Sequence, residues 1–145
     1  MKKLYTAHAT ATGGRNGHAE TDDKNLVVEL SSPGVPNKKS GLTTNPEQLF
    51  ACGYAACFGS ALEHVAKLQN ITVSNVSVSS EVSLNQDDSG FFISATLNVT
   101  IPGIDNAIAE KLVQAAHKVC PYSKATKGNI EVTLKVNDQA LTQAA

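Results

Sequence analysis

The chain has 145 residues, a formal net charge of −1 and 41% hydrophobic residues, which is typical of a single globular domain with a real core. No basic stripe runs along a predicted helix, which argues against nucleic acid as a partner. The lysines near the start are not followed by an apolar run, so no signal peptide and no membrane span are predicted. We therefore expect a cytoplasmic protein, and lasting disulfides are rare in that compartment.

The first 31 residues are predicted to form short strands around a glycine-rich turn. The expected strands are residues 3–12, 18–20 and 25–31. The turn is Gly13-Gly14-Arg15-Asn16-Gly17, a strong signal by composition. Residues 32–44 then form a loop, whose length hints at a functional or partner-facing role. The charged side chains interpreted as solvated surface charge are Asp22, Asp23, Lys38 and Lys39.

Residues 45–69 are predicted to form one long buried helix at the centre of the fold. Asn45 suits the N-cap and Pro46 suits the first helical position. The apolar run that follows is better matched to a core helix than to a membrane span, which needs roughly 20 apolar residues. Gly53 and Gly59 within this helix indicate close approach by another helix or backbone. We therefore predict that a second copy of the chain completes part of the core.

The second half of the chain is predicted to contain a hairpin, a helix and a last strand. The expected ranges are 72–101 for the hairpin, 105–120 for the second helix and 130–136 for the strand. Pro121 is expected to end the second helix. The order strands, helix, hairpin, helix and strand predicts an α+β fold rich in antiparallel pairing, in a single domain over residues 1–145.

The chain has three cysteines, Cys52, Cys57 and Cys120, which form no CxxC pair, and its histidines are scattered, so no zinc site is predicted. Cys57 lies inside the central helix, where an inert buried thiol is the common alternative to a reactive one. Cys120 lies at a helix end beside Pro121, where a thiol can swing towards a second thiol. A buried cysteine and a hinge cysteine suit a peroxidatic and resolving pair, although spacing leaves open whether they meet. Cys52 is about 140° around the helix from Cys57 and is interpreted as inert.

A reactive Cys57 needs a positive neighbour, because an ordinary thiol has a pKa of about 8.5 and is mostly protonated at neutral pH. Arg15, in the glycine turn, is the candidate, and an exposed loop arginine is the alternative. Glu47, in the first turn of the central helix, has two readings as well. It is either a charge favoured by the helix dipole or one half of a bidentate clamp that fixes Arg15 over the thiol.

Three separated motifs resemble the organic hydroperoxide resistance (Ohr) proteins of the OsmC/Ohr family, and the resemblance covers essentially the whole chain. They are TTNPEQLFACGYAACF (43–58), GGRNG (13–17) and AHKVCPYSKAT (116–126). The resemblance implies an intertwined α+β homodimer with two long central helices flanked by sheets. It also implies a catalytic set in which Cys57 is peroxidatic, Cys120 resolves it, and Arg15 and Glu47 complete the site. Cys52 departs from the alanine found in many relatives.

The implied activity is thiol-dependent reduction of organic (alkyl, fatty-acid) hydroperoxides to alcohols through a Cys57 sulfenic acid and a Cys57–Cys120 disulfide. The resemblance implies reduction of that disulfide by a dithiol, in the family a lipoylated protein, with no metal, flavin or haem. The apolar residues expected to favour alkyl substrates include Phe50, Tyr54 and Phe58. Three alternatives stay open: an OsmC-branch peroxidase, a non-catalytic redox-sensing or ligand-binding dimer, and a structural dimer with unreactive thiols.

Overall fold

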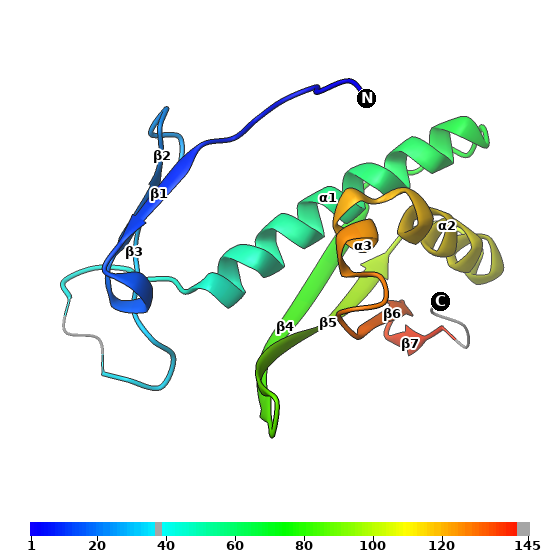
Figure 1. Cartoon of the computed structure of the whole chain (residues 1–145). Coiled ribbons are helices and arrows are strands. Elements are labelled where there is room, and N and C mark those ends of the chain that lie inside the picture. Colours follow the sequence, from blue (N-terminus) through cyan, green and yellow to red (C-terminus); the bar gives the residue numbers. More distant parts are fainter. Residues whose placement is uncertain (37–38, 142–145) are drawn as a thin grey trace. The chain divides into compact units, whose positions relative to one another are not determined.

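The computed structural model describes residues 1–36 and 39–141 and divides into two compact units, Met1–Leu49 and Phe50–Ala145 (Figure 1). Its strands and helices confirm the predicted α+β class with two long helices and antiparallel-rich sheets. Helix α1 (Pro46–Leu68) runs through the boundary between the units. Lys38, one of the predicted surface charges, lies outside the described residues. The single domain over residues 1–145 stays a prediction.

Unit Met1–Leu49 is built on a three-stranded antiparallel sheet with the order β1-β2-β3. Its strands are β1 (Ala9–Thr12), β2 (His18–Thr21) and β3 (Val27–Glu29), of which β1 and β3 are shorter than predicted. The turn between β1 and β2 holds a 3₁₀ helix, Gly14–Asn16. Gly17 has to be glycine, because a Cβ atom there would lie 1.7 Å from the carbonyl oxygen of Thr12. This turn carries Arg15.

Helix α1 begins as predicted. Pro46 is its first residue, and Asn45 Oδ1 accepts a hydrogen bond from the backbone N–H of Gln48 at 2.9 Å. The prediction of one long buried helix is wrong for the single chain, because only one face of α1 is buried. Its buried side chains are Tyr54, Phe58, Ala61, Leu62, Val65 and Ala66. A stripe at i, i+4 and i+8, made of Cys52, Ala56 and Ser60, is exposed.

By length and composition alone, α1 would also pass for a membrane span. Of the 18-residue stretch of α1 that is apolar enough to span a membrane, 33% is buried within the chain. The buried face belongs to the hydrophobic core of unit Phe50–Ala145. Within the single chain, α1 therefore packs one face on the core and leaves the other face exposed.

Unit Phe50–Ala145 contains a four-stranded sheet with the order β4-β5-β6-β7. Strands β4 (Ser77–Asp87) and β5 (Gly90–Thr100) form the predicted hairpin, whose last pair is Asp87 with Gly90. Strand β6 (Val132–Val136) pairs with β5 in parallel and confirms the predicted last strand. A further short strand, β7 (Gln139–Ala140), was not predicted.

Two helices precede β6 in the chain. Helix α2 (Asn106–Val119) is capped by Asp105, whose side chain accepts a hydrogen bond from the backbone N–H of Ala107. A second, short helix, α3 (Pro121–Thr126), follows directly and was missed by the sequence. Pro121 therefore ends one helix and begins another, since proline fits the first helical position.

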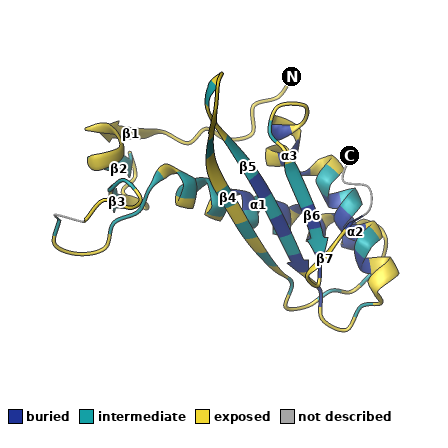
Figure 2. Cartoon of the chain, turned by 90° about the horizontal axis from the view of Figure 1, so that it is seen from below, coloured by how far each residue is buried: buried dark blue, intermediate teal, exposed yellow. Residues whose placement is uncertain are grey.

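The core of this unit lies between α1, α2 and the sheet. Burial alternates along β5, where Ala95, Leu97 and Val99 point into the core. Figure 2 shows the buried residues gathered on the inner strands and on the inward side of α2. The largest fully buried side chains include Tyr54 and Phe58 of α1. Packing of α1 against this core fixes the position of the residues on its neighbouring turns.

Candidate redox-active site

Cys57 and Cys120 meet in unit Phe50–Ala145, although they are 63 residues apart in the chain. Both are free thiols, and the Cys120 thiol donates a weak hydrogen bond to Cys57 Sγ, with the two sulfur atoms 3.7 Å apart. A disulfide bond is about 2.05 Å long, so the sulfur atoms need to approach by less than about 2 Å to join. The spacing of the cysteines left open whether Cys57 and Cys120 meet, and the structure brings them together.

Cys120 lies at the C-terminal end of α2, beside Pro121, as the sequence predicted. Its sulfur is fully buried, and its backbone is extended between α2 and α3. Its N–H donates to Ala116 O at 2.8 Å, and its carbonyl oxygen accepts from Lys124 N–H at 2.9 Å. Cys120 thus closes one helix and opens the next, and the corner between α2 and α3 is held on both sides.

The surroundings of Cys57 favour the protonated thiol. Burial raises the pKa of Cys57 above its ordinary value, and the neighbouring Cys120 thiol raises it further. The backbone N–H of Tyr122 acts in the opposite direction by hydrogen bonding to the sulfur. Within its own unit, Cys57 is therefore mostly protonated at neutral pH. This agrees with the expectation that a reactive Cys57 thiolate needs a positively charged neighbour.

An aromatic cluster adjoins the thiol pair. Phe50, Gly53, Tyr54 and Cys57 lie on one face of α1 at i, i+3, i+4 and i+7. The ring of Tyr122 lies over Gly53, where an added Cβ atom would come within 2.8 Å of the Tyr122 hydroxyl. Its centroid is 5.9 Å from that of Phe50 and 5.7 Å from that of Tyr54. Gly53 therefore provides the space that Tyr122 occupies.

The expected set of substrate-facing apolar residues needs correction. Tyr54 and Phe58 are fully buried in the core and present no surface to a substrate. Phe50 is partly buried, and Tyr122 is 38% exposed. The accessible rings beside the thiol pair are thus Phe50 and Tyr122. Sequence reasoning missed Tyr122, because its packing on Gly53 joins segments far apart in the chain.

A buried polar network fixes α3 against α1. The Tyr54 hydroxyl lies 2.9 Å from Ser123 Oγ and 3.2 Å from Thr126 Oγ1. Ser123 Oγ lies 2.8 Å from His117 Nδ1, which extends the network to α2. Burial, and then the charge of Lys127, lower the pKa of His117. The network surrounds the corner that carries Cys120 and holds it in place.

Arg15 and Glu47 form the predicted bidentate pair within unit Met1–Leu49. Arg15 Nη1 donates to Glu47 Oε2 at 2.8 Å, and Arg15 Nη2 donates to Glu47 Oε1 at 2.6 Å. The Glu47 side chain is 11% exposed and that of Arg15 is 41% exposed. Hydrogen bonding to Arg15 lowers the pKa of Glu47, and the same bonds raise the pKa of Arg15. The clamp is confirmed, and its place over the thiol stays a prediction.

The interpretation of Lys39 as solvated surface charge is wrong. Its ammonium group lies 2.8 Å from Glu29 Oε2 and also donates to the carbonyl oxygen of Gly17 in the glycine turn. Glu29 in turn lies 2.6 Å from His18 Nδ1, and hydrogen bonding to Glu20 and Glu29 raises the pKa of His18. A charged cluster therefore ties the later part of the loop to the turn that carries Arg15.

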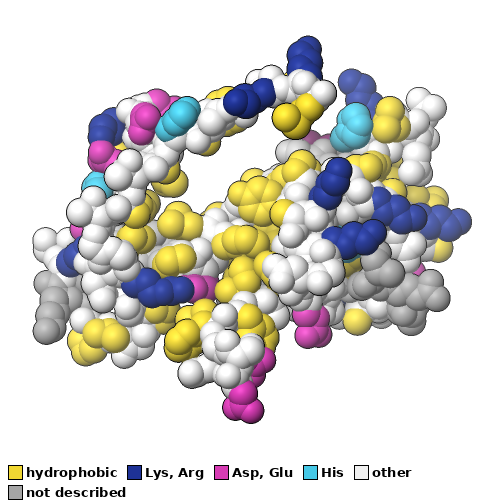
Figure 3. Space-filling view, viewed as in Figure 1, with side chains coloured by type: hydrophobic (Ala, Val, Ile, Leu, Met, Phe, Trp, Pro, Cys, Tyr) yellow, Lys and Arg dark blue, Asp and Glu magenta, His cyan; other side chains and the backbone are white. Residues whose placement is uncertain are grey.

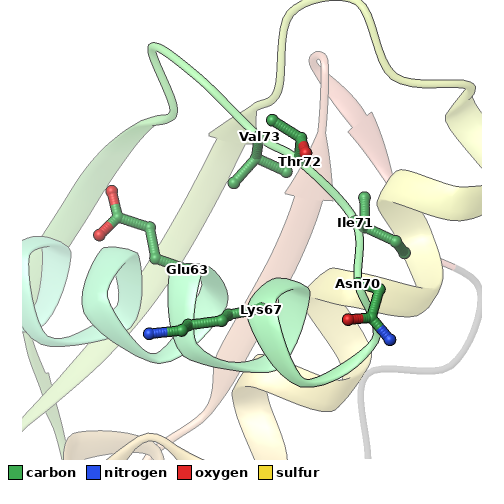
Figure 4. A pocket seen from close by; sticks show the side chains of 6 residues that line it. All are labelled: Glu63, Lys67, Asn70, Ile71, Thr72 and Val73. Carbon is green, nitrogen blue, oxygen red and sulfur yellow. The ribbon is translucent and has the colours of Figure 1, made fainter.

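Two further features of α1 are a third cysteine and a cavity at its C-terminal end. Cys52 is exposed, and among the described residues its thiol has no hydrogen-bond partner. A cavity of about 480 Å³ at the C-terminal end of α1 is lined by six residues, none of them a cysteine (Figure 4). They are Glu63, Lys67, Asn70, Ile71, Thr72 and Val73. Within residues 1–36 and 39–141, no group of three or more His, Cys, Asp and Glu side chains could hold a metal ion.

The fold is that of an OsmC-like protein, and the profile of that family matches residues 36–135. The chain is 52% identical to the organic hydroperoxide resistance protein of Xanthomonas axonopodis pv. citri, over 92% of this chain and 94% of that one. The crystal structure of the organic hydroperoxide resistance protein OhrB of Bacillus subtilis matches with a TM-score of 0.87 and 50% identity, over 92% of this chain and 99% of that one.

A structure of an organic hydroperoxide resistance protein from Legionella pneumophila matches with a TM-score of 0.85 and 51% identity, over 93% of this chain and 98% of that one. The chain therefore belongs to the OsmC/Ohr family, as its three motifs indicated.

Proposed function

We propose that this protein is a cysteine-based peroxidase of the cytoplasm that reduces organic hydroperoxides to alcohols and so provides organic hydroperoxide resistance. The single observation that carries the proposal is the 3.7 Å separation of the Cys57 and Cys120 sulfur atoms in the reduced, free-thiol state. Two thiols this close can store and release two electrons through a disulfide. The names of the relatives supply the substrate class.

The oxidation step begins with the Cys57 thiolate, because Cys57 is the partly exposed sulfur and Cys120 is fully buried. The thiolate attacks the distal oxygen of the hydroperoxide, and the O–O bond breaks. The alkoxide takes a proton and leaves as the alcohol, and Cys57 becomes a sulfenic acid. The exposed faces of Phe50 and Tyr122 beside the sulfur suit an organic substituent better than hydrogen peroxide.

The resolution step joins the two sulfurs. The Cys120 thiol attacks the Cys57 sulfenic acid, a disulfide forms, and water leaves. An external dithiol then returns two electrons and restores both thiols; a protein-bound lipoyl group has the required chemistry. No bound cofactor enters this cycle. The fixed corner between α2 and α3 keeps Cys120 close enough to act before a second peroxide over-oxidises Cys57.

Activation of Cys57 is assigned to Arg15, held by Glu47. A guanidinium beside the sulfur would offset the burial that raises the thiol pKa. Glu47 belongs to unit Met1–Leu49 and Cys57 to unit Phe50–Ala145. We propose that the guanidinium clamped at Glu47 serves the thiol of a second copy of the chain.

Exposed hydrophobic residues of unit Met1–Leu49 also support the proposed homodimer. All four residues of β1 are exposed, and so are several large hydrophobic residues of unit Met1–Leu49. They include Leu4 at 85%, Tyr5 at 80% and Leu42 at 98% exposure. A three-stranded sheet without a covered apolar face is not stable alone in water. A second copy would cover this surface and the exposed small-residue stripe of α1.

Peroxide turnover tests the function. Purified protein with dithiothreitol or dihydrolipoamide should consume many equivalents of cumene hydroperoxide, with one dithiol oxidised for each alcohol formed. Consumption of a single equivalent would instead identify a redox sensor, and no consumption with thiols intact would identify a structural protein. A stronger rate with hydrogen peroxide than with cumene hydroperoxide would contradict the substrate class.

Mixed dimers test the shared site. Arg15→Ala chains, whose activity is strongly reduced, and inactive Cys57→Ser chains are unfolded, mixed and refolded together. If Arg15 serves the thiol of the partner, random mixing restores about one quarter of the parental activity, because half of the dimers then hold one complete site. Sedimentation should show a dimer. In thermal melts, the melting temperature should rise with protein concentration. No recovery on mixing, with a monomer in sedimentation, would overturn the shared site.

A further inference from the structure

A second concave surface lies at the corner between α2 and α3, in the segment that carries Cys120. It is a cavity of about 250 Å³ lined by His117, Lys118, Ser123, Lys124 and Lys127, which we call the basic corner. Figure 3 shows dark blue Lys and Arg side chains gathered over α2 and α3. The three lysines are exposed, and Ser123 is buried at the floor.

The positive charge of the basic corner is uncompensated. Residues 111–130 contain no aspartate or glutamate, in a chain whose net charge is −1. Within the described part of the chain, Lys118, Lys124 and Lys127 take part in no ion pair. Three like charges around one hollow repel each other, so an anionic surface placed there gains energy.

The floor of the hollow distinguishes a docking surface from a small-anion site. Ser123 Oγ is already engaged by His117 at 2.8 Å and by the Tyr54 hydroxyl at 2.9 Å. A buried site for a free anion would offer unengaged donors at its floor. The unengaged donors are instead the long ammonium groups at the rim, which suit carboxylates spread over a facing protein surface.

We propose that the basic corner is the docking surface for an acidic face of the protein that delivers the reducing dithiol. This inference rests on the proposed function, which requires a dithiol at every turnover. The partner thiolate attacks the accessible Cys57 sulfur of the disulfide, the Cys57–Cys120 bond breaks, and Cys120 leaves as a thiolate that takes a proton. The second partner thiol then attacks the mixed disulfide and releases Cys57, so the partner ends as a disulfide.

Two synthetic peptides test the docking surface. Both carry the same Cys-Gly-Gly-Cys dithiol, joined to eight Asp and Glu residues in one and to eight Asn and Gln residues in the other. The oxidised protein is mixed with one peptide at a time or, in a separate reaction, with dithiothreitol alone. The rate of reduction of the Cys57–Cys120 disulfide is measured at low salt. We expect the acidic peptide to react about tenfold faster than the neutral one, and added salt to remove the difference.

Charge-reversed variants locate the effect. Lys118→Glu, Lys124→Glu and Lys127→Glu together should abolish or invert the preference for the acidic peptide. The matched control reverses three exposed lysines elsewhere, Lys2, Lys3 and Lys67, and should keep the preference. If the triple glutamate variant does not fold by circular dichroism, the corresponding glutamine variant replaces it and should still lose the preference.

The outcomes separate the two proposals. Equal rates for the two peptides, or a preference that survives reversal of the basic corner, overturn the docking surface. Saturable shifts of the His117 resonances with submillimolar inorganic phosphate would also overturn it, in favour of a small-anion site. Failure of dithiothreitol to reduce a peroxide-treated parent would instead contradict the proposed function itself.

Discussion

The two units of this chain are held together in different ways. Unit Phe50–Ala145 has its own hydrophobic core, and the thiol pair lies against it. In the described part of unit Met1–Leu49, Leu30 is the one buried hydrophobic residue, and the Arg15–Glu47 clamp is held by charge and hydrogen bonds. The thiol pair is therefore fixed by packing in a hydrophobic core, whereas the Arg15–Glu47 pair lies in a unit with little core of its own.

The packing that assembles the thiol pair also disfavours its reactive form. Burial by the core brings Cys57 to Cys120 and also raises the Cys57 pKa. A thiol with a raised pKa is mostly protonated at neutral pH and reacts slowly, so we expect its activation to depend on a cation. The predictions that follow test the core-held pair and the charge-held clamp in turn.

The largest effect on activity is expected from replacing Cys57, which lies against the hydrophobic core. Replacing Cys57 by Ser should abolish the reduction of cumene hydroperoxide, because serine cannot form the sulfenic acid. Replacing Cys52 by Ser is the control and should leave the rate within about twofold, because serine is close to cysteine in size and Cys52 has no role in the proposed cycle. Turnover with dithiothreitol as reductant measures both. Activity lost with Cys52 and kept without Cys57 would reverse the assignment.

The next effect concerns the clamp. Removing the cation by Arg15→Ala should return the Cys57 pKa to the raised state that burial gives it within its own unit, because no positive charge then opposes burial. The oxidation rate at neutral pH should fall about 10- to 1000-fold, as for the loss of one to three pKa units of charge stabilisation. Arg15→Lys should recover part of the loss, since lysine lacks the planar fork that fits Glu47.

The measurement for the clamp is the pH dependence of Cys57 alkylation by iodoacetamide, in a background lacking Cys52 and Cys120. The midpoint should move to higher pH in Arg15→Ala and lie in between in Arg15→Lys. Glu47→Ala should move it less, because the guanidinium remains but is no longer fixed. An Arg15→Ala profile that overlays the parent would remove Arg15 from the mechanism.

A smaller effect is expected in the network that holds the Cys120 corner. Tyr54→Phe removes a buried hydroxyl that contacts Ser123 and Thr126, and it should lower the free energy of unfolding by about 1 kcal/mol. Tyr122→Phe is the matched control, because its partly exposed hydroxyl has no hydrogen bond among the described residues. Urea unfolding compares the two, and equal losses would contradict the role of the network.

The smallest effect separates the two glycines of α1. Gly59→Ala should stabilise the protein by about 0.5–1 kcal/mol, because alanine favours the helix and its Cβ meets Val78 at an ordinary 3.7 Å. Gly53→Ala should gain less, because its Cβ would lie 2.8 Å from the Tyr122 hydroxyl and 3.3 Å from ring atoms. Thermal melts at matched concentration measure the difference, and equal gains would show that Tyr122 does not need this space.

Much of the fold could be predicted from short stretches of sequence. Asn45 and Pro46 mark the start of α1, and Asp105 marks that of α2, because capping depends on neighbouring residues. Helix α3 was missed because six residues are too few for a periodic pattern. The same limit applies to β7, which has two residues.

The candidate site was predictable where local chemistry restricted the choice. The glycine turn and the first turn of α1 indicated Arg15 and Glu47 as candidate site residues. These two residues form a bidentate ion pair in the structure. The contacts of Tyr122 with Gly53, and of Tyr54 with Ser123, were not predictable, because they join residues 69 positions apart in the chain. The meeting of Cys57 with Cys120 depends on the same long-range packing.

The central claim is that Cys57 and Cys120 form one redox pair, and peptide mass spectrometry after a single equivalent of cumene hydroperoxide tests it most directly. The account predicts that the reduced protein loses two hydrogen atoms, that a digest links the Cys57 peptide to the Cys120 peptide, and that Cys52 is still a free thiol after denaturation. A Cys57 sulfinic acid with Cys120 still free, or a disulfide that includes Cys52, would contradict it.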